Sequence, residues 1–195
     1  MSAPMVNLFY VKDFRHEHRL FSSEPPAVPV KPTKARAAWD LAKRKLMLLP
    51  QRTMRQEQAF DRALRMTEPS VRILHGAADA KHLNLKFKFF LNRQRGRRLL
   101  ILIGELLLVP IAGVAALLPG PNVAFYALAL LIITHWQSFR GIRHLLKKEL
   151  VYEASPVIEA WEAAVEEKRE EDYPALLEAI EKEHGLAGLR KVLWK

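Results

Sequence analysis

The sequence contains no cysteine, only eight glycines, and almost no charge in its central part. Without cysteine, the chain has no disulfide framework, no thiolate metal site and no cysteine nucleophile. It also lacks a glycine-rich phosphate loop and the GxSxG and HExxH motifs, which argues against a nucleotide-binding fold and against common hydrolytic enzymes. We therefore expect no enzymatic activity, no cofactor and no metal site.

Charge divides the 195 residues into three parts. Residues 1–98 hold 21 Lys and Arg against 8 Asp and Glu, and residues 140–195 hold 10 against 12. Between them, residues 99–139 hold a single charged side chain, Glu105. The net charge of +10 therefore arises in the first half of the chain, and the last part is slightly acidic.

The uncharged centre contains two apolar runs, residues 99–118 and 123–139, separated by the sequence PGPN at residues 119–122. A helix of about 20 residues spans roughly the 30 Å of a bilayer core. Basic residues flank both outer ends and none lies in the turn, which places both termini on the cytoplasmic or matrix side. The sequence thus predicts an all-α membrane protein with a two-helix transmembrane hairpin, a multi-pass protein of a bacterial cytoplasmic or mitochondrial inner membrane. A buried helical hairpin inside a soluble bundle is the alternative.

Four regions follow from this prediction. Residues 1–32 form an extended N-terminal arm with a Pro-rich linker, in which residues 5–14 favour a short strand. Residues 33–98 form a basic helical region, with helices expected over 33–49, 54–67 and 69–76 and another from Asp79. Residues 99–139 are the transmembrane hairpin. Residues 140–195 form amphipathic and acidic helices that begin after Ser155 and Asp172, the second ending at Gly185.

Basic side chains gather on either side of the apolar runs, where phenylalanines are interleaved with them. Such a cluster fits nucleic acid, anionic lipid headgroups, or the ordinary charge bias of a membrane protein. Its position beside an apolar run favours the last two, so we expect no nucleic-acid partner. The candidate lipid-binding residues are Lys86, Lys88, Arg93, Arg95, Arg97, Arg98, Arg140 and Arg143.

Four residues of the apolar region are candidates for handling a proton or a cation. Glu105 and His135 lie at nearly the same distance from the turn, and a carboxylate and an imidazole at one depth form a proton-holding pair if they face each other. Pro110 frees a backbone carbonyl within the first run, and Asn122 shapes the turn. The alternative roles are structural: Glu105 reaches the headgroups or pairs with a nearby arginine, and Pro110 only bends the helix.

Three features resemble the mitochondrial K+–H+ exchange-related family of small inner-membrane proteins. They are the aromatic and basic sequence KFKFFLNRQRGRR at residues 86–98, the first apolar run with Pro110 and the PGPN turn, and a pattern of Phe125-Tyr126, His135-Trp136, Arg140-Gly141 and Leu145. The resemblance covers roughly residues 82–146. It implies a part in monovalent cation (potassium)/proton exchange, as a component or regulator.

A second function fits the same residues. In it, the protein is a structural membrane adaptor that grips anionic lipid and recruits a protein partner through its acidic tail. Two helices alone enclose no pore, so exchange would need a homo-oligomer or a larger membrane complex.

Overall fold

The computed structural model of the chain describes residues 6–22, 51–65, 70–76, 80–115 and 123–194. In chain order the elements are β1 (Val6–Lys12), β2 (His18–Ser22), α2 (Gln51–Arg65), β3 (Ser70–His75), α3 (Ala80–Ala115), α4 (Val123–Leu145), β4 (Glu149–Ala154), α5 (Pro156–Glu166), the short helix η1 (Glu170–Asp172), α6 (Tyr173–His184) and η2 (Arg190–Trp194). The helix expected over residues 33–49 lies outside the described ranges.

The fold is mixed α/β and is built on a four-stranded sheet in the order β2-β1-β3-β4. Strands β1 and β2 pair antiparallel, whereas β1 with β3 and β3 with β4 pair in parallel. The all-α prediction is therefore wrong, although the strand expected near the N-terminus is confirmed as β1. The helix expected over residues 69–76 is instead β3, because a short apolar run does not by itself distinguish a buried strand from a helical turn.

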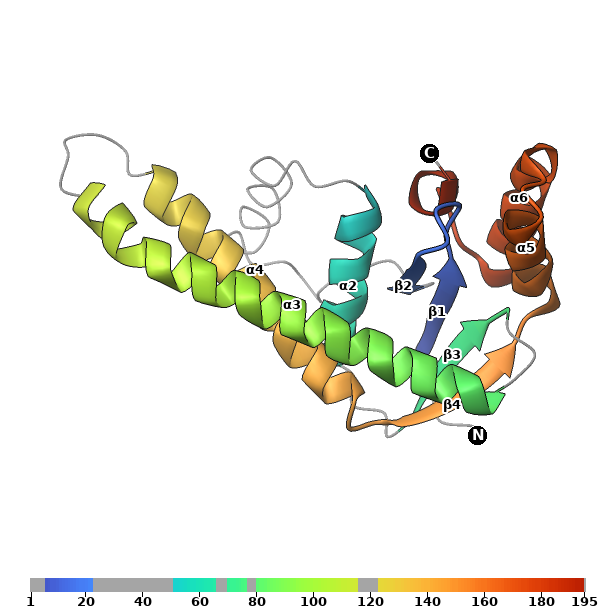
Figure 1. Cartoon of the computed structure of the whole chain (residues 1–195), viewed down its shortest axis with the longest axis horizontal. Helices are drawn as coiled ribbons and strands as arrows, with labels where there is room; N and C mark the ends of the chain where they lie inside the picture. The colour runs from blue at the N-terminus through green and yellow to red at the C-terminus, as the bar shows by residue number, and fades with distance from the viewer. Residues whose placement is uncertain (1–5, 23–50, 66–69, 77–79, 116–122, 195) are drawn as a thin grey trace, which may run out of the picture.

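Two hydrophobic clusters lie on opposite faces of the sheet, because successive side chains of a strand point to opposite sides. Leu8, Tyr10 and Ile73 join the cluster beneath α2, α3 and α4. Phe9 and Val11 join the other cluster, beneath α5, α6 and η2. The sheet is thus covered by helices on both faces, as Figure 1 shows.

Helix α3 is 36 residues long and joins two parts that the sequence analysis separated. Its first half, with the basic residues, crosses over the sheet, and its second half contains most of the first apolar run. Helices α3 and α4 lie side by side and extend away from the sheet (Figure 1). We call residues 99–114 of α3 and residues 125–136 of α4 the arm.

Within the described ranges, no helix has a stretch that is both long enough and apolar enough to cross a membrane. The predictions of a transmembrane hairpin and of a multi-pass inner-membrane location are therefore wrong. The physical reason lies in the polar end of the second apolar run. Ser138, just beyond the arm, is buried and donates a hydrogen bond to a carboxylate of α2, so this end of the run belongs to the body of the protein.

Helix α4 comes very close to the backbone of α2 at Gly141. A Cβ atom built on Gly141 would lie 1.9 Å from the carbonyl oxygen of Phe60 and 2.7 Å from its carbonyl carbon. Phe60 itself is fully buried in the cluster under α3 and α4. Only glycine permits these two helix backbones to come so near.

The C-terminal helices follow the sequence prediction closely. Helix α5 begins at Pro156, directly after Ser155, and α6 ends at Gly185, which adopts the left-handed conformation with φ of 63°. Trp161 of α5 is fully buried and donates a hydrogen bond from Nε1 to the carbonyl oxygen of Lys12, at 2.8 Å. This contact ties the acidic end of the chain to the first strand.

Candidate functional site

The outer faces of the arm are apolar and open to solvent. The exposed fractions of Leu100 and Leu107 are 72% and 71%, and the other large hydrophobic residues of the arm that are exposed are Leu99, Ile103, Leu106, Leu108, Ile111, Val114, Phe125, Tyr126, Ile133 and Trp136. Folded monomers seldom expose a continuous apolar patch larger than roughly several hundred Å². This surface is therefore the strongest sign of a binding function among the described residues.

The one charged residue of the arm points inward. Glu105 Oε1 of α3 lies 2.6 Å from Nδ1 of His135 on α4, and Glu105 is only 8% exposed. Its second oxygen, Oε2, is buried and accepts no hydrogen bond within the described ranges. The structure thus brings together two residues that the sequence placed at one depth, and it leaves the outer faces of the arm uncharged.

A buried polar network lies where the arm joins the body. Arg98 of α3 forms an ion pair with Glu57 of α2, and Glu57 accepts a hydrogen bond from the hydroxyl of Ser138 on α4. Burial lowers the pKa of Arg98, and the negative charge of Glu57 opposes this shift. The network therefore holds three helices together through one shared carboxylate.

Sequence reasoning missed Glu57. One signal in the sequence could have found it. Acidic residues are scarce in residues 1–98, so each carboxylate there is a candidate partner for a buried cation. Arg98, predicted to bind lipid, is instead buried against Glu57 and is only 7% exposed. Arg98 is therefore not accessible to a ligand at the protein surface.

The other predicted residues lie in varied places. Pro110 is exposed inside α3, and the helix continues beyond it to Ala115. Asn122 lies outside the described ranges. The remaining lipid-binding candidates are all exposed, and they are Lys86, Lys88, Arg93, Arg95 and Arg97 on α3 with Arg140 and Arg143 on α4.

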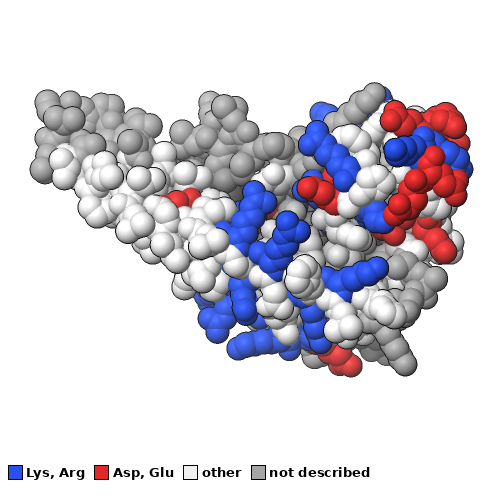
Figure 2. Space-filling model, viewed as in Figure 1, with Lys and Arg blue, Asp and Glu red and all other residues white. Residues whose placement is uncertain are grey.

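Charge is segregated along the molecule. Figure 2 shows Lys and Arg gathered where α3 crosses the body, and Asp and Glu gathered around α5 and α6. The described part of the arm is almost free of both on this face. The molecule thus has an apolar arm at one end, basic residues where the arm joins the body, and acidic residues at the opposite end.

In the described ranges, no three His, Asp or Glu side chains converge as ligands for a metal ion. The candidate functional site therefore consists of the exposed apolar surface of the arm and the buried polar network between α2, α3 and α4. No protein-family model, curated protein or solved structure shows significant similarity to this chain.

Proposed function

We propose that the protein is an adaptor that attaches peripherally to an anionic lipid surface. The observation that carries this proposal is the exposed apolar face of the arm, which continues directly into exposed cations on the same helix, α3. Exposed apolar side chains enter the upper acyl chains of a bilayer, and neighbouring cations bind the anionic headgroups.

The single charged group of the arm supports a lipid-facing role. A carboxylate on the outer face would have to leave water on contact with lipid, at a high cost in free energy. Glu105 avoids this cost because it faces α4 and pairs with His135. The outer face therefore meets apolar surroundings without burying a lone charge.

Charge favours lipid over a second copy of the chain as the occupant of this surface. Two arms packed side by side in the same direction would bring two sets of exposed cations together, including Arg93, Arg95 and Arg97 of each copy. Anionic headgroups neutralise those cations instead. The acidic end around α5 and α6 lies away from the arm and is left to recruit a basic protein partner.

A pair of matched substitutions tests the adaptor proposal. Leu107 and Leu85 are both on α3 and both 71% exposed, but only Leu107 belongs to the arm. Either change to glutamate adds one negative charge, which weakens binding to anionic vesicles about fivefold. Leu107→Glu also removes apolar burial, so we expect a total loss of about fiftyfold. Co-sedimentation with phosphatidylglycerol vesicles measures both.

Two results would contradict the proposal. One is equal loss of vesicle binding in Leu107→Glu and Leu85→Glu. The other is a stable dimer in sedimentation equilibrium without lipid that Leu107→Glu converts to monomer, since a second copy would then occupy the arm.

A second candidate function is a part in potassium/proton exchange, as a component or regulator. The contact between Glu105 and His135 favours it, because a buried carboxylate with one free oxygen beside an imidazole is an arrangement that holds and passes a proton. In this function the pair takes up or releases a proton as a cation moves in a partner protein.

The test is potassium-dependent proton flux across membrane vesicles from cells that produce the protein. We expect flux above that of vesicles without the protein, and loss of this increment in both Glu105→Gln and His135→Ala. Glu159→Gln, which neutralises an exposed carboxylate on α5, is the control and should retain the increment. An increment that survives in Glu105→Gln would rule out the pair as the proton-handling group.

A further inference from the structure

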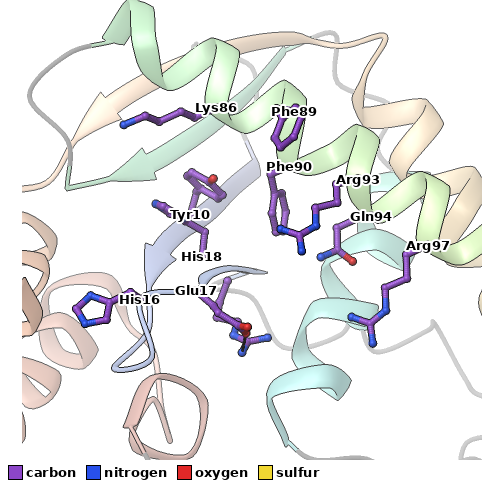
Figure 3. A pocket seen from close by; sticks show the side chains of 11 residues that line it. Tyr10, His16, Glu17, His18, Lys86, Phe89, Phe90, Arg93, Gln94 and Arg97 are labelled. Carbon is purple, nitrogen blue, oxygen red and sulfur yellow. Dashed lines mark hydrogen bonds and ion pairs between the residues drawn. The ribbon is translucent and has the colours of Figure 1, made fainter.

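A pocket of about 550 Å³ opens between the β1–β2 hairpin and the first half of α3, at the base of the arm (Figure 3). Its volume is in the range of small-molecule sites, roughly 300–1,000 Å³. The side chains that line it are Tyr10, His16, Glu17, His18, Arg19, Lys86, Phe89, Phe90, Arg93, Gln94 and Arg97. Neither the arm nor the Glu105–His135 pair contributes to it.

Three of the cations in this pocket come from one face of α3. Lys86, Arg93 and Arg97 are spaced by seven and four residues, which places them on one side of a helix. All three are exposed, and no ion pair holds any of them within the described ranges. Together they leave the α3 wall of the pocket with a strong excess of positive charge.

The charged groups on the opposite wall form ion pairs with one another. Arg19 donates from Nε to Asp13 Oδ2 at 2.8 Å and pairs through Nη2 with Glu17 Oε2 at 2.5 Å. One arginine between two carboxylates leaves this wall with a net charge of −1, against the three cations of α3. The pocket as a whole therefore favours an anion with about two negative charges.

Aromatic rings form the inner wall and the mouth. Tyr10 stacks on His18 with ring centres 4.5 Å apart, and Phe90 meets Tyr10 edge-on at 5.3 Å. Phe89 is 71% exposed beside them. Figure 3 shows Phe90 and Tyr10 near each other between α3 and the strands. A ligand in this pocket therefore meets the cations of α3 together with aromatic side chains from α3 and from the strands.

The protonation states of the wall fit an anionic ligand. Burial, with the charges of Lys12 and Lys86, lowers the pKa of His18 to about 4, against smaller opposing effects of Asp13 and Glu166. His18 is therefore neutral at pH 7. Burial also raises the pKa of Tyr10, so its phenol stays protonated.

We propose that this pocket binds a phosphate monoester, with the phosphate held by Arg93 and Arg97, with Lys86 adding positive charge farther along α3, and with the rest of the ligand lying on Phe89 and Phe90. Arginines suit this role because their planar guanidinium groups bind phosphate oxygens in pairs. Two sources carry the same chemistry, a phosphomonoester lipid headgroup and a free phosphate compound. The phosphate site itself does not depend on the adaptor function.

The first experiment uses the whole protein and two soluble probes, inorganic phosphate and glycerol 3-phosphate. We expect the double variant Arg93→Gln/Arg97→Gln to raise the dissociation constant at least tenfold in calorimetry. Arg95→Gln is the matched control, because Arg95 is an exposed arginine of the same helix outside the pocket, and it should change binding by less than about twofold. We also expect the His18 pKa, followed by NMR, to rise when phosphate binds, because the anion offsets the charge of Lys86.

Equal weakening in Arg95→Gln and in the double variant would overturn the proposal, and so would the absence of millimolar binding with an unchanged His18 titration. Either result would mean that only diffuse positive charge is present. A folded double variant, checked by circular dichroism, is required for the comparison.

The second experiment distinguishes the sources with vesicles containing phosphatidic acid, a phosphate monoester, or phosphatidylglycerol, a diester, at matched surface charge. A preference for phosphatidic acid that disappears in Arg93→Gln/Arg97→Gln assigns the pocket to a lipid headgroup. Equal binding to both vesicles, with soluble phosphate still bound, assigns it to a free phosphate compound. Leu107→Glu keeps the two proposals separate, since it should lose vesicle binding and retain binding of soluble phosphate.

Discussion

Replacing Gly141 by alanine is expected to lower the free energy of unfolding by about 3 kcal/mol or more. The added methyl group would lie 1.9 Å from the carbonyl oxygen of Phe60, so the backbones of α2 and α4 would have to separate. Phe60 lies in the cluster beneath α3 and α4, and a shift there spreads into the packing against the sheet. Urea unfolding followed by circular dichroism measures the change.

Gly96→Ala provides the control for this prediction. Gly96 lies inside α3, and no atom is within 4 Å of the position that its Cβ would take. Alanine there should raise the free energy of unfolding by about 0.5–1 kcal/mol, because it favours the helix. If Gly141→Ala were as stable as Gly96→Ala, the close contact between α2 and α4 would be wrong.

Replacing Arg98 by methionine is expected to cost about 3–5 kcal/mol, because it leaves the Glu57 carboxylate buried without its cation. Both side chains are almost fully buried, with exposed fractions of 9% and 5%. Water therefore cannot take over the role of the arginine. Arg95→Met, at an exposed position of the same helix, should change stability by less than about 0.5 kcal/mol.

The double variant Arg98→Met/Glu57→Leu tests the cause of this loss. Removing both charges abolishes the unpaired carboxylate, so we expect stability to return to within about 1 kcal/mol of the parent protein. The remaining loss reflects the hydroxyl of Ser138, which donates to Glu57 in the parent. Additive losses in the double variant would show that packing, rather than an unpaired charge, accounts for the single-variant effect.

Helices with clear end signals were predicted well from the sequence. The Ser155-Pro156 pair marks the start of α5, and Gly185 marks the end of α6, where the chain needs a left-handed residue. These signals are local, so they do not depend on knowing the tertiary structure. The sequence offered no such stop between Arg97 and Leu99, and there the two expected helices are one.

The strands β3 and β4 were missed because their defining contacts are distant in sequence. β3 pairs with β1 on one side and β4 on the other, both in parallel, and neither pairing has a hairpin turn that a sequence pattern reveals. β4 is also an edge strand in which exposed residues, including the glutamates at 149 and 153, outnumber half-buried ones. It therefore lacks the apolar run that marks a buried strand. Parallel pairing is set by the tertiary fold, which a short sequence window does not contain.

The candidate site was predicted in part. Counting residues from the turn placed Glu105 level with His135, and the structure shows them in contact, but counting gives no helix rotation. The same count gave no sign that α2 would cover the polar end of α4 and take Arg98 and Ser138 into the body. The low charge of residues 99–139 therefore identified a distinctive region of the chain. The prediction that both of its helices cross a membrane was wrong.

The parallel pairing of β3 with β4 determines how late in synthesis of the chain the sheet can be completed. Ser70 pairs with Glu149, so the whole of α3 and α4 must leave the ribosome before the sheet gains its last strand. Such high contact order slows folding, and during the delay the apolar arm is present without a finished body. A nascent chain of this design is expected to need a chaperone, or early contact with its binding surface, to escape aggregation.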